Sequence, residues 1–136
     1  MKPFGIWLII SLLGFGGLGS ASHLYLSRHP RKVLVALDSS FPMKPVWPRV
    51  DQTLETLGRR RYTQFGLITE KNRIHSWAPR LTPGRITPYA PRDFSKLENA
   101  TGYPETEAAD EKILLTNATQ EHLARMDTWE VIRLTP

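Results

Sequence analysis

Cysteine is absent from all 136 residues of the sequence. Its absence excludes a disulfide-stapled scaffold, a cysteine-ligated zinc knuckle and a thiol nucleophile. Histidine is scarce, and its four copies show neither the HxxxH nor the HExxH spacing of a zinc site. The chain also lacks a glycine-rich phosphate loop and the GxSxG turn of a serine hydrolase. These absences remove the commonest signatures of metalloenzymes, nucleotide-binding enzymes and hydrolases.

A long segment near the start of the chain lacks charge. Residues 4–27 carry no ionisable side chain other than His23 and Tyr25, and residues 4–18 are almost wholly apolar. As a helix, residues 4–26 span about 34 Å, against about 30 Å for the hydrocarbon core of a bilayer. We therefore expect residues 1–27 to form a transmembrane anchor.

Two alternatives concern this segment: whether it is cleaved, and on which side of the membrane the following domain lies. A cleaved signal peptide would use the small residues 19–22 as its cleavage site, but apolar residues continue to Leu26 and favour an uncleaved anchor. Three basic residues within 28–32 outnumber Lys2 and, by the positive-inside rule, place the following domain in the cytoplasm. The short basic start resembles an export signal instead. We expect a single-pass protein of a bacterial inner membrane with its soluble domain in the periplasm.

After a basic linker at residues 28–31, strand and helix patterns alternate through residues 32–136. Apolar and β-branched runs predict strands at residues 32–37, 62–69, 74–77, 112–116 and 128–134. Helices are expected after Pro45 as far as Gly58, and from Asn117 or Thr119 through Met126. The fold class is therefore α/β: a small Rossmann-like, mainly parallel sheet with one antiparallel edge hairpin.

Polar residues follow two of the buried strands. Asp38 and Ser40 come directly after the first strand, and Asn117 follows the fourth. Ligands of such sheets bind outside the carboxyl ends of the strands. We therefore expect Asp38 and Asn117 to share one rim of the domain.

The segment Val33-Leu34-Val35-Ala36-Leu37-Asp38-Ser39-Ser40 resembles the first strand and DxSxS loop of von Willebrand factor A domains. Phe65-Gly66-Leu67-Ile68-Thr69 and Ile74-His75-Ser76-Trp77-Ala78-Pro79 are similar to the second and third strands of that family. Ile113-Leu114-Leu115-Thr116-Asn117 resembles its LLTDG strand. The chain thus resembles an abbreviated member of this family.

The resemblance implies a metal-ion-dependent adhesion site in which oxygen ligands hold Mg²⁺ and leave one position for a partner's carboxylate. Asp38, Ser40 and Thr82 match ligand positions of that site. Pro42 stands at the third position of DxSxS and Asn117 replaces an aspartate, so a single carboxylate is left. Two interpretations follow: a degenerate Mg²⁺ site, or a metal-free relic without a cofactor, which the loss of charge favours.

An enzyme is the alternative class of function. A strand that ends in aspartate also resembles the first motif of haloacid-dehalogenase-type phosphotransferases. That chemistry needs a second acid two residues after the nucleophile, and Ser40 stands there. We therefore expect no catalytic residues.

Charge is unevenly distributed along the chain. Residues 28–97 hold 14 basic and 5 acidic side chains, whereas residues 98–136 hold 3 basic and 8 acidic ones. The densest basic cluster follows the expected helix end and consists of Arg59, Arg60 and Arg61. Its arginines suit the helix dipole, anionic lipid headgroups or an acidic partner. The acidic segment 105–111 forms a solvated loop or pairs with the basic half of a second copy. Nucleic-acid binding is disfavoured, because aromatic residues are not interleaved with the basic ones.

Four aromatic residues near the loop end of the domain are candidate partner contacts, although the first two also suit the core: Trp47, Trp77, Tyr89 and Phe94. We expect a membrane-anchored, non-enzymatic interaction module that binds another envelope or membrane-complex protein. The alternative is an accessory subunit held in a membrane complex mainly by its transmembrane helix.

Overall fold

The structure is a computed structural model that describes residues 2–98 and 102–135. The chain divides into two compact units, of which the first ends at Pro30 and the second begins at Arg31. The first residue of the expected anchor and the last residue of the expected domain lie outside the described residues.

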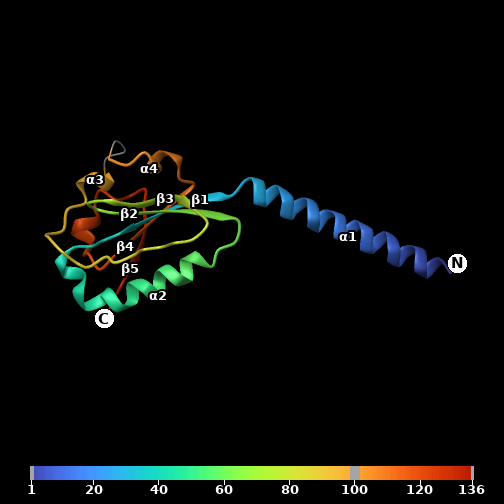
Figure 1. The fold of residues 1–136 in the computed structure, drawn as a ribbon, viewed down its shortest axis with the longest axis horizontal. Coiled ribbons are helices and arrows are strands. Elements are labelled where there is room, and N and C mark those ends of the chain that lie inside the picture. The colour runs from blue at the N-terminus through green and yellow to red at the C-terminus, as the bar shows by residue number, and fades with distance from the viewer. Residues whose placement is uncertain (1, 99–101, 136) are drawn as a thin grey trace. The chain divides into compact units, whose positions relative to one another are not determined.

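The first unit consists of one helix, α1 (Pro3–Arg28), drawn in blue in Figure 1. Its 26 residues correspond to about 39 Å of helix. None of its residues is buried, and large apolar side chains are exposed along its length. Among the described residues it is the one helix long and apolar enough to cross a membrane. The segment is therefore consistent with the expected anchor, and by length and composition also with a signal sequence.

The second unit is built on a five-stranded sheet in the order β3-β2-β1-β4-β5. Its strands are β1 (Arg31–Leu37), β2 (Thr63–Thr69), β3 (Arg73–Ala78), β4 (Glu111–Thr116) and β5 (Glu130–Arg133). Strand β1 pairs in parallel with β2 and β4, β4 pairs in parallel with β5, and β3 pairs antiparallel with β2. The mainly parallel sheet with one antiparallel edge is confirmed. The expected basic linker at residues 28–31 is shorter, because only His29 and Pro30 separate α1 from β1.

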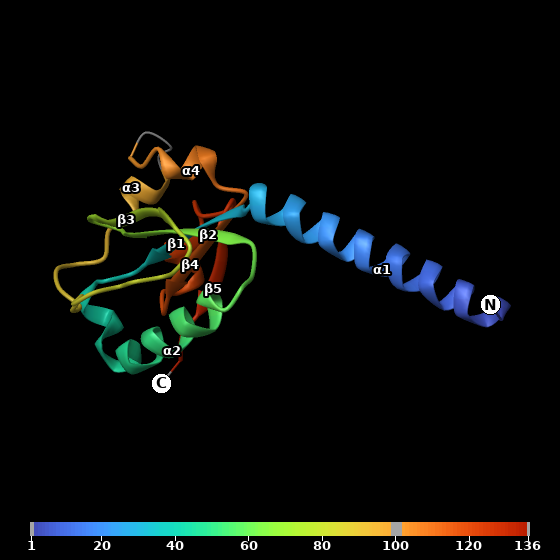
Figure 2. The same cartoon turned by 45° about the vertical axis from the view of Figure 1, so that its right-hand side comes forward.

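Both faces of the sheet are covered (Figures 1 and 2). Helix α2 (Trp47–Gly58) packs on one face, and α3 (Ser95–Glu98) and α4 (Glu105–Ala108) lie over the other. Alternate residues of β1 serve the two faces: Val33, Val35 and Leu37 belong to the cluster under α2, whereas Leu34 and Ala36 belong to the opposite one. Because both faces of β1 are buried, its apolar residues form a continuous run and do not alternate with polar ones.

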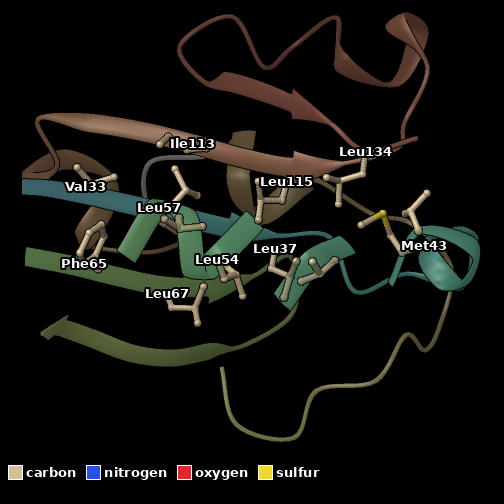
Figure 3. Packing of buried hydrophobic residues seen from close by; sticks show 13 residues of the cluster. Val33, Leu37, Met43, Leu54, Leu57, Phe65, Leu67, Ile113, Leu115 and Leu134 are labelled. Carbon is tan, nitrogen blue, oxygen red and sulfur yellow. The ribbon is translucent and has the colours of Figure 1, made fainter. Parts of the chain in front are cut away.

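Helix α2 follows a short 3-10 helix, η1 (Phe41–Val46), and has Pro48 in its first turn, where a missing N–H costs nothing. Its buried residues Val50, Leu54 and Leu57 recur every three or four positions, as the sequence predicts. Figure 3 shows Leu54 and Leu57 directed at the sheet.

The helix predicted from residue 117 or 119 through Met126 does not form. The structure has only a short 3-10 helix there, η2 (Gln120–Leu123), and Thr119 provides no side-chain cap. The carbonyl of Ala118, which a helix would pair with the N–H of residue 122, accepts two hydrogen bonds from the guanidinium of Arg133 at 2.9 and 3.1 Å. The prediction was wrong because the groups expected to start the helix are used in tertiary contacts: the Asn117 side chain bonds Pro42 and Arg92, and the Ala118 carbonyl bonds Arg133.

We predict that Gly66→Val destabilises the domain. A Cβ at Gly66 would lie 3.0 Å from Leu34 Cδ1 and 3.3 Å from the Trp77 ring, so a branched side chain overpacks this face of β2. The free energy of unfolding should fall by about 1–3 kcal/mol, measured by thermal or urea denaturation.

Gly58→Ala is the matched control, because its Cβ would meet only Leu81 Cβ at 3.9 Å and because alanine favours helix. It should leave stability unchanged or raise it. Equal destabilisation by both variants would contradict the packing described for Gly66.

Candidate functional site

The carboxyl ends of β1, β2 and β4 each deliver a polar side chain to one edge of the sheet. Asp38 follows β1, Glu70 follows β2 and Asn117 follows β4. We call this edge, formed by residues 38–44, 70–72, 85–92 and 117, the carboxyl rim. Parallel pairing of the three strands places these residues together.

Asp38 is fully buried, and both of its carboxylate oxygens are occupied. Oδ1 accepts hydrogen bonds from the Ser40 backbone N–H at 3.0 Å and from the Ser40 hydroxyl at 2.6 Å. Oδ2 accepts hydrogen bonds from the Thr116 hydroxyl at 2.6 Å and from Arg92 Nε at 2.9 Å. The guanidinium of Arg92 supplies the positive charge that this buried carboxylate requires.

Arg92 joins three separate segments of the chain. It belongs to the irregular segment between β3 and α3, and its side chain is 13% exposed. Besides Asp38, it donates a hydrogen bond to Asn117 Oδ1, and Asn117 Nδ2 donates one to the carbonyl of Pro42 at 2.7 Å. Asp38 and Asn117 therefore share one rim, and one guanidinium binds both.

A second buried carboxylate, Glu70, lies at the same rim. Its Oε2 accepts a hydrogen bond from the Ser39 backbone N–H at 2.8 Å, and its Oε1 accepts one from the Ser39 hydroxyl at 3.2 Å. Lys71 forms an ion pair with it. Each buried acid of the rim is thus neutralised by one basic side chain, and both acids hold the loop that follows β1.

Two aromatic side chains are exposed on this rim. Phe41 is 52% and Tyr89 42% exposed, and they are the exposed large apolar side chains of the second unit within its described residues. Two backbone hydrogen bonds keep their segments adjacent, from Phe41 N to Ala90 O at 3.0 Å and from Tyr89 N to Ser39 O at 2.7 Å.

Each exposed ring carries a cation. Lys44 Nζ lies 5.3 Å from the Phe41 ring centre, and Lys71 Nζ lies 4.6 Å from that of Tyr89. Beside Tyr89 there is a cleft of about 210 Å³, lined by Ser39, Thr69, Asn72, Ile74, Arg85, Ile86, Thr87 and Tyr89. The rim therefore combines aromatic surface with positive charge.

The structure brings Asp38, Ser40 and Asn117 together but places Thr82 elsewhere. The backbone N–H of Thr82 bonds His75 Nε2 at 3.2 Å, and the neighbouring Leu81 lies against Gly58 at the end of α2. Because β3 runs antiparallel to β2, its final residue, Ala78, is at the amino end of the parallel strands. The segment that follows β3 therefore starts at the edge opposite Asp38.

The donor set at Asp38 does not fit a divalent cation. It contains one carboxylate, whose charge is already paired with Arg92, and Mg²⁺ would have to displace that guanidinium. Among the described residues, histidine, aspartate and glutamate side chains do not gather into a group of three that could hold a metal.

The predicted aromatic contacts differ in their burial. Phe94 is 5% exposed and lies in the core cluster opposite α2, so it is not available to a partner in this structure. Trp47 and Trp77 are half-buried against the two core clusters. Tyr89 is exposed at the rim, and the arginines Arg59, Arg60 and Arg61 lie beyond the end of α2, at the opposite edge of the domain.

Sequence reasoning missed Arg92, Glu70 and Phe41. Glu70 had a usable signal, because it follows a buried strand as Asp38 does. Arg92 had none, since a proline-rich loop gives no periodicity from which to place a side chain.

Two of the four acidic side chains in the segment 105–111 form intramolecular ion pairs. Glu105 pairs with Arg73 at 2.7 Å, and Glu111 pairs with Arg60 at 2.9 Å and Arg31 at 3.5 Å. Glu107 and Asp110 are not in these ion pairs, so pairing of the segment with a second copy stays a prediction.

Comparison of the chain with known protein families, with characterised proteins and with solved structures finds no match.

We predict that Arg92→Met lowers stability by about 3–5 kcal/mol, because it leaves a buried carboxylate without its counter-charge. Arg85→Met, at an exposed position of the same loop, should change stability by less than about 0.5 kcal/mol. The double variant Asp38→Asn/Arg92→Met removes both charges and should regain part of the loss. Denaturation of the wild type, Asp38→Asn, Arg92→Met and the double variant gives the coupling energy of the pair, and wild-type stability of Arg92→Met would contradict its role.

The pH dependence of stability tests the Glu111 pairs. Burial raises the pKa of Glu111, but the hydrogen bond and charge of Arg60 and the charge of Arg31 outweigh it, so the pKa lies below its usual 4.5. The carboxylate therefore stabilises the fold above that value, and its contribution is lost as the pH falls through the lower, folded-state pKa. Glu111→Gln should melt below the wild type at neutral pH and converge on it in acid. A pH-independent difference would contradict this.

Proposed function

We propose that the chain is a membrane-anchored, non-enzymatic interaction module whose carboxyl rim binds another membrane or envelope protein. The observation that carries the proposal is the placement of Phe41 and Tyr89. The second unit buries its other large apolar side chains wholly or in part within its described residues, yet it exposes these two on adjacent segments of one rim, with a cation over each ring. Aromatic residues and cations of this kind are enriched at the centres of protein interfaces.

The fold supports a von Willebrand factor A-like assignment of this module. The strand order 3-2-1-4-5 is that of a doubly wound sheet, and such sheets bind their ligands at the carboxyl ends of the strands. Arg92 supplies Asp38 with the positive charge that the metal ion would supply in an adhesion site. We infer that the rim binds its partner without a metal.

The state of the polar groups supports a non-enzymatic role. A nucleophilic carboxylate must be reached by its substrate, and Asp38 is fully buried with its charge paired to Arg92. The hydroxyl of Ser40, at the position of the expected acid, donates a hydrogen bond to Asp38. Activity of the purified chain on a generic phosphate ester would contradict this assignment.

We infer that α1 is an uncleaved anchor in a bacterial inner membrane. Its exposed apolar side chains, which have no cover within the described residues, support membrane insertion, and the apolar run that continues to Leu26 favours an uncleaved segment. The short basic start before the apolar segment favours a periplasmic domain. A carboxyl-terminal reporter that is active only after export should be active, and an inactive reporter would place the domain in the cytoplasm.

A photo-reactive phenylalanine analogue at position 41 or 89 of the full chain should cross-link one defined protein in the membrane. The same analogue at Gln52, an exposed position of α2, should not. Phe41→Ala and Tyr89→Ala should each weaken recovery of that protein about 30-fold, as hot-spot residues do, while Gln52→Ala leaves it unchanged.

Exchange of α1 for an unrelated transmembrane helix separates this function from that of an accessory subunit held by its helix. Retained cross-linking from position 41 supports the rim. Loss of cross-linking with normal membrane insertion would contradict the rim and favour the helix.

A further inference from the structure

Basic side chains from distant parts of the sequence gather at the edge opposite the carboxyl rim. This edge contains the start of β1, the turn after α2 and the segment after β3. Pairing of Arg31 with Thr63 aligns the starts of β1 and β2, and Leu81 lies against Gly58 at the end of α2. We call the resulting group the basic edge; it consists of Arg31, Lys32, Arg59, Arg60, Arg61 and Arg80.

The turn that carries three of these arginines is fixed to the start of β1. Tyr62 adopts a φ of 52°, in the left-handed region that a tyrosine seldom enters. Its carbonyl accepts a hydrogen bond from the Arg31 backbone N–H at 2.9 Å. Backbone strain of this kind persists where surrounding contacts hold it, so the arginines of the turn have a defined place beside Arg31.

Internal ion pairs do not neutralise the basic edge. Arg31 and Arg60 share the single carboxylate of Glu111, and Arg59 pairs with Glu55 while its own side chain is 75% exposed. Arg61 and Arg80 are exposed and form no ion pair within the part of the chain that the structure describes.

Nearby charges reduce the excess without removing it. The Asp110 carboxylate, beside the start of β1, accepts the backbone N–H of Lys32 rather than pairing with an arginine. At the starts of β4 and β5, Lys112 and Glu130 add one charge of each sign. Positive charge therefore remains available at the surface.

Chain connectivity keeps this edge within reach of the membrane surface. Only His29 and Pro30 separate the end of α1 from Arg31, and three Cα–Cα steps cover at most about 11 Å. Attraction between basic residues and anionic headgroups acts over about 8–10 Å at physiological salt. Arg31 therefore stays close to that range whatever direction the domain takes.

We propose that the basic edge binds anionic phospholipid headgroups of the membrane that α1 enters, so that the carboxyl rim at the other end of the domain is directed away from the bilayer. Arginine suits this ligand, because its planar guanidinium forms paired hydrogen bonds with phosphate oxygens. An acidic protein is the less favoured partner, because the exposed aromatic residues that anchor protein interfaces lie at the opposite rim. This inference rests on the membrane insertion of α1 proposed above.

The absence of cysteine allows the test to be made with one introduced label on the full chain. Thr56→Cys, exposed in the last turn of α2, places a fluorophore beside the basic edge, and Thr87→Cys places it at the carboxyl rim. The labelled chains are reconstituted in vesicles that carry a nitroxide quencher on the lipid headgroup. One set of vesicles contains phosphatidylcholine alone, and the other adds phosphatidylglycerol.

We expect quenching at position 56 in the anionic vesicles and much less in phosphatidylcholine alone, with little at position 87 in either. Salt at about 1 M, where screening shortens the interaction to about 3 Å, should abolish the difference. Equal quenching at position 56 in both kinds of vesicle, or stronger quenching at position 87, would overturn the proposal. Absence of quenching at position 56 would also overturn it and would leave an acidic protein as the partner of this edge.

Matched variants show whether headgroup binding depends on the basic edge or on the net charge of the chain. Arg59→Gln, Arg61→Gln and Arg80→Gln are combined in one chain that keeps both ion pairs of Glu111. Since each basic residue near an anionic surface is worth about fivefold in binding, headgroup association should fall at least about tenfold. The control combines three other arginine changes, Arg49→Gln, Arg85→Gln and Arg125→Gln, and should keep its quenching. Equal loss in both triple variants would overturn the proposal, because it would show a response to overall charge.

Flotation with vesicles at high salt reports insertion of α1 independently of the edge. A chain that floats but shows no quenching refutes the basic edge alone, and a chain that does not float refutes the anchor and the edge together. Thermal melting of each triple variant confirms that the domain is folded.

Discussion

The arrangement of the soluble domain depends on the burial of a carboxylate at the end of its central strand. Asp38 is placed between the loops of its neighbours by parallel pairing on both sides of β1 and is fully removed from water. Such a charge is tolerated only with a partner, and Arg92 provides one from a segment 54 residues away. A proline-rich segment without regular structure is thereby held against the sheet.

The same pair accounts for the exposed surface of the rim. Because Arg92 and the backbone of Ala90 fix the loop from position 85 to 92, the segment that carries Tyr89 is held against the segment that carries Phe41. Glu70 and Lys71 hold the other side of this surface, and Lys71 lies over the Tyr89 ring. Buried charges therefore position exposed aromatic residues.

The two ends of the domain differ in chemistry, and the difference follows from the topology. Strand starts and the end of α2 collect arginines around the point where the chain enters the domain, whereas strand ends collect hydroxyls and neutralised acids. A parallel sheet separates these two sets by the length of its strands. The proposed functions use this separation, with lipid at one end and a protein partner at the other.

Much of this fold can be predicted from the sequence, and the failures have physical causes. The uninterrupted apolar run of β1 identifies a buried strand, and the stripe Val50, Leu54 and Leu57 identifies helix α2. Both can be predicted because the spacing of apolar residues reflects which face of an element is buried. The rim position of Asp38 and Asn117 follows from topology alone. Thr82 is displaced because the antiparallel hairpin, which the sequence does predict, carries the segment after β3 to the edge opposite Asp38. The failed helix after Asn117 and the role of Arg92 each depend on a contact between residues distant in sequence. Local patterns carry no information about such contacts.

A guanidinium, rather than a metal ion, completes the buried site at Asp38. Thermal melting of the full chain with excess Mg²⁺ and with a chelator distinguishes the two. We expect the same melting temperature in both solutions. A higher melting temperature in Mg²⁺ that disappears in Asp38→Asn would show that a cation binds this carboxylate, and would contradict the account.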